Sequence, residues 1–175
     1  MKISLRSSLH MELKTNRRYA LKRTKLLLMV LSPVFVGFLL NQILLSNPSI
    51  IYAAPFLMIG YWFWVGRKFA AYVRNPFGAI LLANAMGIVS LAVYYWQFIL
   101  TSGQARNTIL AGLSQMFSAP LSMITARIGL VFEKAPDEIT QVTAFVMQAA
   151  GLTLMITIFC IGYFTKKRQA RKHAG

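Results

Sequence analysis

Long runs of residues without a charge constrain this chain more than any other feature. Three such runs lie at residues 26–45, 77–100 and 139–164. A helix needs about 20 apolar residues to cross roughly 30 Å of hydrocarbon, and each of these runs is long enough. A soluble basic protein would spread its charges over a surface, whereas this chain gathers them into short blocks. The pattern predicts an all-α, polytopic integral membrane protein.

A fourth and shorter uncharged run, at residues 50–66, ends in Tyr61-Trp62-Phe63-Trp64 and is followed by Arg67 and Lys68. Tyrosine and tryptophan prefer the headgroup level of a bilayer, and adjacent cations mark its cytoplasmic side. Stacking of a ligand by these rings is the alternative. With this run the sequence predicts a bundle of four transmembrane helices. The predicted regions are a basic N-terminal tail (1–25), a membrane domain (26–164) and a basic C-terminal tail (165–175).

The stretch from Asn107 to Phe132 is apolar enough to resemble a fifth span, yet it carries Pro120 and Arg127. Its apolar residues recur at spacings of three and four, as on one face of a helix, while most of its hydroxyl residues fall off that stripe. Pro120 predicts a break that leaves two short helical pieces. We therefore expect an additional amphipathic segment on the outer face, interfacial or re-entrant, with its apolar side in lipid or on the bundle.

The distribution of charge favours four spans over five. If residues 107–132 do not cross the membrane, 16 of the 19 lysines and arginines lie on one side. A fifth span would place the basic C-terminal block outside, against the positive-inside bias. Both termini are therefore expected in the cytoplasm. No eukaryotic sorting signal is visible, which favours the plasma (inner) membrane of a bacterium.

Insertion topology also explains the net charge of +15, so no nucleic-acid partner is expected. The expected partners are the lipid bilayer, anionic lipid headgroups at the cytoplasmic face, and either a membrane-protein partner or further copies of the chain. Basic residues beside a charged leaflet attract such headgroups. The candidate contacts with anionic lipid are Arg17, Arg18, Lys22, Arg23, Lys25, Lys166, Lys167 and Arg168.

Polar and small residues inside the predicted spans mark where helices meet, because a buried amide in hydrocarbon needs a partner. Packing between helices and the lining of a narrow path are both compatible with them. The polar candidates are Asn84, Gln97, Gln148, Thr153 and Thr157. A stripe of small residues that lets another helix approach closely is formed by Ala79, Ala83 and Gly87.

No arrangement of residues for catalysis is visible. The only cysteine, Cys160, lies in an apolar run, both histidines lie in the tails, and the four predicted spans contain no charge. Phosphate-binding loops and zinc motifs are absent from the sequence. The acidic cluster of Glu133, Asp137 and Glu138 follows the pattern of a helix start rather than a cation site. We therefore expect no catalytic, metal or cofactor site, and no enzyme activity.

These features favour a non-enzymatic accessory or assembly subunit of a larger membrane complex. The alternative is a small transporter or channel component, whose path would be lined by polar residues of the third and fourth spans. In that alternative, the segment at residues 107–132 would act as a lid.

Overall fold

The computed structural model describes residues 24–40, 42–43, 49–132 and 140–172. These residues are helical almost throughout and include no strand, so the all-α prediction is confirmed. The helices are Thr24–Leu40, α2 (Ile50–Tyr72), α3 (Pro76–Tyr94), the π-helix η1 (Tyr95–Leu100), η2 (Gly103–Ala105), α4 (Thr108–Met116), η3 (Ala119–Leu121), α5 (Ser122–Gly129), η4 (Leu130–Phe132) and α6 (Gln141–Lys172).

Two helical stretches among the described residues, Pro76–Leu100 and Gln141–Lys172, are long and apolar enough to cross a membrane. A third is added if α4 and the bent continuation Ala119–Gly129 count as one span. The helix α2 falls outside this set because its tyrosines, tryptophans and two cations lower its mean hydropathy. The helix Thr24–Leu40 is shorter. By length and composition the chain thus has two or three candidate spans, and the predicted four-span bundle is not confirmed.

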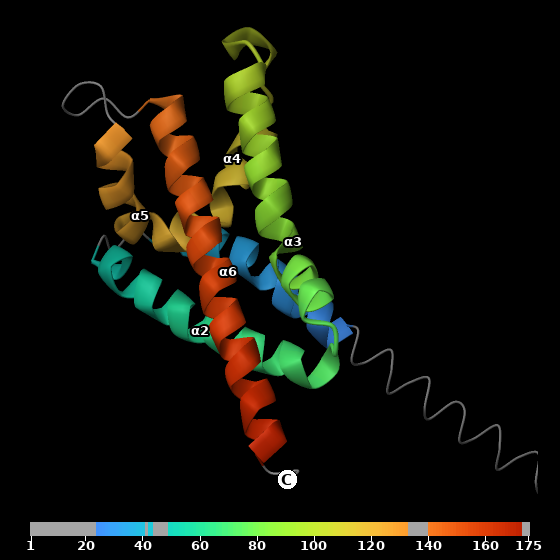
Figure 1. The fold of residues 1–175 in the computed structure, drawn as a ribbon. Helices are drawn as coiled ribbons and strands as arrows, with labels where there is room; N and C mark the ends of the chain where they lie inside the picture. Colours follow the sequence, from blue (N-terminus) through green and yellow to red (C-terminus); the bar gives the residue numbers. More distant parts are fainter. Residues whose placement is uncertain (1–23, 41, 44–48, 133–139, 173–175) are drawn as a thin grey trace, which may run out of the picture.

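The long helix α6 runs through the middle of the molecule, and α2 crosses it obliquely rather than lying alongside (Figure 1). The two helices cross closely because each has a glycine at the contact, Gly66 on α2 and Gly162 on α6. A Cβ atom on Gly66 would overlap the Phe159 carbonyl, and one on Gly162 would overlap the Phe63 carbonyl. Only residues without a side chain let the two backbones approach in this way.

Large aromatic side chains fill the core beside this crossing. Trp62 and Phe69 of α2 are fully buried, as is Phe159 of α6. The Phe69 and Phe159 rings lie edge to face with their centroids 5.4 Å apart, and Trp62 meets Phe117 edge-on at 6.4 Å. Such aromatic contacts join α2, α6 and the end of α4 in one apolar core.

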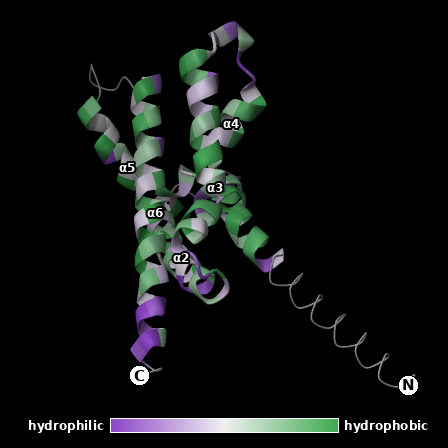
Figure 2. Cartoon of the chain, turned by 45° about the vertical axis from the view of Figure 1, so that its right-hand side comes forward, coloured by the Kyte–Doolittle hydropathy of each residue, from purple (hydrophilic) through white to green (hydrophobic). Residues whose placement is uncertain are grey.

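Helices α2 and α6 both extend beyond the uncharged runs at residues 50–66 and 139–164. The helix α2 continues past Arg67 and Lys68 to Tyr72, so the connection to α3 is only Val73–Asn75. Burial of Phe69 in the core explains this extension. The helix α6 likewise continues through the basic run to Lys172, where hydrophilic residues gather at its C-terminal end (Figure 2).

The predicted segment at residues 107–132 is a pair of short helices, α4 and α5, with axes inclined at 52°. The break at Phe117–Leu121 contains Pro120, which confirms the predicted interruption. We call residues Thr108–Phe132 the bent segment. Its position beside α3 and α6 follows from contacts along its length.

The first half of the bent segment runs back along α3. Its start is fixed by a hydrogen bond from the Asn107 backbone N–H to the Gln97 side-chain oxygen (2.8 Å). Further along, the Ser90 hydroxyl donates to the Ser114 carbonyl (2.6 Å). The break then reaches Gly87, where the Phe117 ring occupies the space that a Cβ would need. The chain from Asn107 to Phe117 therefore runs antiparallel to α3.

The second half of the bent segment runs antiparallel to α6. Thr125 packs near Gly151, and Gly129 packs on Met147 and Thr143, closer to the start of α6. The Tyr94 and Phe145 rings stack with centroids 6.4 Å apart, so α3 ends where α6 begins. Both ends of the bent segment therefore lie at this end of the molecule, which we call the hairpin end (Figures 1 and 2).

The side of the bent segment that faces the other helices carries both polar and apolar residues. Ser114 and Thr125, which lie off the apolar stripe, are buried, whereas Leu113 and Ile128 of the stripe are exposed. The Ser114 hydroxyl donates to the Ala111 carbonyl (2.7 Å). Because these hydroxyls bond to their own helix backbone, they can be buried without a partner elsewhere. Of the two predicted alternatives for the apolar stripe, packing on the bundle is observed for Phe117, Pro120 and Leu121, whereas Leu113 and Ile128 face outward.

Candidate functional site

Asn84 of α3 is fully buried, one turn before Gly87. Its Nδ2 donates to the Ile80 carbonyl (2.9 Å), as side chains often do within a helix. Its Oδ1 has no hydrogen-bond partner among the described residues. An unpartnered buried acceptor is costly, typically about 1–3 kcal/mol. Asn84 therefore stands out from the other buried polar residues.

A complementary donor without a partner lies in the same core. The Trp62 indole Nε1 is buried and has no acceptor among the described residues. Trp62 packs on the Phe117 ring, and that ring also covers Gly87, one turn from Asn84. A buried donor and a buried acceptor thus lie on two helices that both pack on Phe117.

Gln97, another predicted path-lining residue, belongs to a polar cluster at the hairpin end. It is almost completely buried on the π-helix η1, and its side chain accepts the hydrogen bond from Asn107. Arg106 donates from Nε to the Gln97 carbonyl (3.1 Å), and its guanidinium lies 4.4 Å from the centroid of the Phe98 ring. A π-helix often marks a functional or strained site. Here it places Gln97 so that both its backbone and side-chain oxygens accept hydrogen bonds.

Gln141 completes this cluster from the start of α6. In the orientation that satisfies its amide, the side chain accepts from Arg106 Nη2 (3.1 Å) and donates to the Phe98 carbonyl. The Gln141 carbonyl also accepts from the Tyr94 hydroxyl (3.4 Å). Arg106 therefore links the end of η1 to α6 just before the bent segment begins. Sequence analysis did not single out Arg106, because one arginine in a short polar loop carries no motif.

The remaining predicted path-lining residues do not join Asn84. Gln148 is buried, but Thr153 and Thr157 are exposed on α6. Their hydroxyls donate to the carbonyls of Ala149 (2.8 Å) and Thr153 (2.9 Å) within the same helix. In the described structure the five polar candidates are thus divided between a buried core, the hairpin end and the outer surface of α6.

The three small residues of the predicted stripe share one buried face of α3. Ala79 and Ala83 have no exposed surface, and Gly87 lies under Phe117 with Leu152 of α6 beside it. Their small size lets α6 and the break of the bent segment approach α3 closely.

The candidate lipid contacts at the C-terminal end all lie on the last turns of α6. Lys166 and Arg168 are exposed, and Lys167 is half-buried with its ammonium 5.7 Å from the Tyr163 ring centroid. Lys25 is exposed at the start of the first described helix. The other predicted contacts, Arg17, Arg18, Lys22 and Arg23, lie outside the described residues, as does the acidic cluster Glu133, Asp137 and Glu138.

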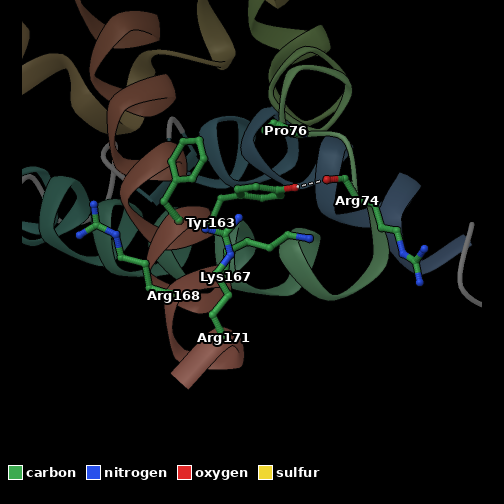
Figure 3. Close-up of a pocket in the computed structure, with 7 residues that line it drawn as sticks. Arg74, Pro76, Tyr163, Lys167, Arg168 and Arg171 are labelled. Carbon is green, nitrogen blue, oxygen red and sulfur yellow. Dashed lines mark hydrogen bonds between the residues drawn. The ribbon is translucent and has the colours of Figure 1, made fainter. Parts of the chain in front are cut away.

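We call the region of the α2–α3 connection and the last turns of α6 the basic end. The two segments are joined there by Tyr163, whose hydroxyl donates to the carbonyls of Val73 (2.9 Å) and Arg74 (3.0 Å). A cavity of about 280 Å³ opens beside this tyrosine (Figure 3). Arg67 is engaged separately, with a hydrogen bond to the Gln169 side chain (3.3 Å).

Within the described part of the chain, no group of three or more histidine, cysteine or acidic side chains is placed to hold a metal ion. Comparison with known proteins adds no assignment, since no family model, curated protein or solved structure matches this chain.

Proposed function

We propose that this chain is a multi-pass membrane protein that serves as a non-enzymatic accessory or assembly subunit of a larger membrane complex. In this proposal α3 and α6 span the bilayer, the basic end faces the cytoplasm, and the bent segment enters and leaves from the opposite side. The chain acts by presenting a helical surface to another membrane protein. Its surface on α6 carries the argument.

A groove of about 470 Å³ follows the outward face of α6. It is lined by Ile156, Thr157, Cys160, Ile161, Phe164, Thr165 and Arg168. Small and hydroxylated side chains on a membrane helix allow the backbone of a second helix to approach closely. The groove thus fits an apolar transmembrane helix of a partner protein. The neighbouring Thr157 and Thr165 hydroxyls already bond to their own backbone, so the partner helix need not supply polar groups.

Purification in a mild detergent tests this proposal. A partner membrane protein should be recovered in a fixed ratio to the chain, and Thr157→Trp should lower that ratio by filling the groove. Leu82→Trp, at an exposed position of α3 away from the groove, is the matched control and should leave the ratio unchanged. A monodisperse, partner-free protein, or equal loss with both variants, would contradict the proposal.

Transport is the second candidate function, and the unpartnered Asn84 oxygen supports it. A polar solute passing between α2 and α3 would satisfy Asn84 and Trp62 in turn. Reconstituted vesicles would then show a solute flux that Asn84→Leu abolishes. Intact, oriented vesicles without any flux of ions or small polar solutes would remove this candidate.

A further inference from the structure

The cavity at the basic end is lined by an unusual excess of positive charge. Four of its seven lining residues are cations, namely Arg74, Lys167, Arg168 and Arg171, and none is acidic. All four acidic residues of the sequence lie outside the described residues. We propose that this cavity binds a phosphate group, carried either by an anionic lipid headgroup or by a soluble phosphate compound.

The cations come from two separate segments. Lys167 and Arg171 are one helical turn apart on α6, and Arg74 follows α2. Figure 3 shows Lys167 reaching toward the connection that carries Arg74, while Arg168 extends to the other side of α6. Like charges four residues apart on a helix destabilise it slightly, and an anion between them reverses that effect. The arginine guanidinium also offers paired donors that match phosphate oxygens.

The cavity has a fixed wall. Because the Tyr163 hydroxyl bonds to the Val73 and Arg74 carbonyls, the α2–α3 connection is held against α6. Lys167 lies over the face of the same ring. The connection that carries Arg74 is therefore held beside the turn of α6 that carries Lys167 and Arg171, so these cations are not merely scattered along an exposed tail.

The size and surroundings of the cavity favour a headgroup over a whole lipid. Its volume of about 280 Å³ is slightly below the range of about 300–1,000 Å³ that holds a drug-sized ligand. Phe164 lines it and is half exposed, and Phe77 beside Pro76 is largely exposed. Acyl chains attached to a bound phosphate could follow these apolar side chains along α3 and α6. Basic pockets between membrane helices are known to bind such headgroups.

The test uses the full chain in neutral detergent and native mass spectrometry, with phosphatidylglycerol, phosphatidylcholine and inorganic phosphate as probes. One phosphatidylglycerol per chain should be retained in preference to phosphatidylcholine. The paired change Lys167→Gln with Arg171→Gln should weaken retention at least about tenfold. The matched pair Lys166→Gln with Lys172→Gln removes the same charge from the same helix outside the cavity and should change it less than about twofold.

A change on the other segment tests whether the cations act together. Arg74→Gln should weaken retention, whereas Lys68→Gln, which removes a cation that lies over Trp64, should not.

Displacement of the lipid by excess inorganic phosphate would identify a soluble phosphate as the ligand, and retention in its presence would identify the lipid. Equal losses with cavity and control variants, or equal retention of phosphatidylcholine, would overturn the proposal. Because the substituted cations lie at the basic end outside the packed core, circular dichroism should show unchanged helicity.

Discussion

Two groups stand out among the buried polar side chains of the described residues. The hydroxyls of Ser90, Ser114 and Thr125 donate to backbone carbonyls. Asn84 and Trp62 instead keep one unpartnered atom each among the described residues. Hydroxyls satisfied by backbone act as small residues that permit close packing. The unpartnered atoms of Asn84 and Trp62 lower the stability of the fold, and a bound water, a ligand or a functional role would explain why they are kept.

Replacing Asn84 by leucine should therefore stabilise the isolated protein or leave its stability unchanged. The change removes an unpartnered acceptor, whose burial typically costs about 1–3 kcal/mol, and keeps the branched shape and the number of side-chain heavy atoms. Thermal unfolding in detergent measures the effect. Asn84→Asp, which buries a carboxyl group at the same place, serves as the contrast and should lower the unfolding temperature. Strong destabilisation by Asn84→Leu would mean that an ordered water or polar ligand is bound there.

Asn84 and Gln97 could be predicted from the sequence because amides are rare in apolar helices, and both are buried. The exposure of Thr153 and Thr157 was not predictable in the same way. A threonine that bonds to the carbonyl four residues earlier needs no partner, so its position in the sequence says nothing about which way it faces.

At the scale of helices, the crossing of α2 and α6 depends on two glycines. Gly66→Ala should destabilise the fold by about 1–3 kcal/mol, because its methyl group would overlap the Phe159 carbonyl and force the helices apart. Gly60→Ala is the matched control on the same helix, since nothing lies within 4 Å of a Cβ there. It should be neutral or slightly stabilising through higher helix propensity. Equal unfolding temperatures for the two variants would contradict the close crossing.

Arg106 controls how the bent segment is attached. Arg106→Ala should lower stability by about 1–2 kcal/mol, since it removes both the hydrogen bond to the Gln97 carbonyl and the contact with the Phe98 ring. Arg127→Ala, at an exposed position of α5, should change stability by less than about 0.5 kcal/mol. Limited proteolysis gives a second measurement. Cleavage near residues 101–107 should accelerate in Arg106→Ala only.

The helices themselves were largely predictable, but their packing was not. The uncharged run 77–100 corresponds to α3 and η1, and Pro120 marks the break in the bent segment. The extension of α2 to Tyr72 was missed because Arg67 and Lys68 resemble a loop until Phe69 is seen in the core. The Gly66–Gly162 contact was missed because neither glycine belongs to a repeated small-residue pattern in the sequence.

At the scale of the whole molecule, the cations and the ends of the bent segment lie at opposite ends. The cations of the α2–α3 connection and of α6 meet at the basic end, and the bent segment starts and finishes at the hairpin end. In the proposed topology α3 and α6 each cross the membrane once, so the chain crosses it twice between the α2–α3 connection and the end of α6. The proposal that both of these segments face the cytoplasm is the arrangement that the positive-inside rule favours.

Labelling of single cysteines in membranes tests this sidedness directly. In a Cys160→Ser background, Arg74→Cys and Lys166→Cys should react only from the cytoplasm, because both positions lie at the basic end. Gln104→Cys and Thr140→Cys flank the bent segment and should react together from the other side. Reaction of Gln104→Cys and Thr140→Cys from opposite sides would make the bent segment a true span. That result would also move Lys166 to the outside, so the two pairs of positions check each other.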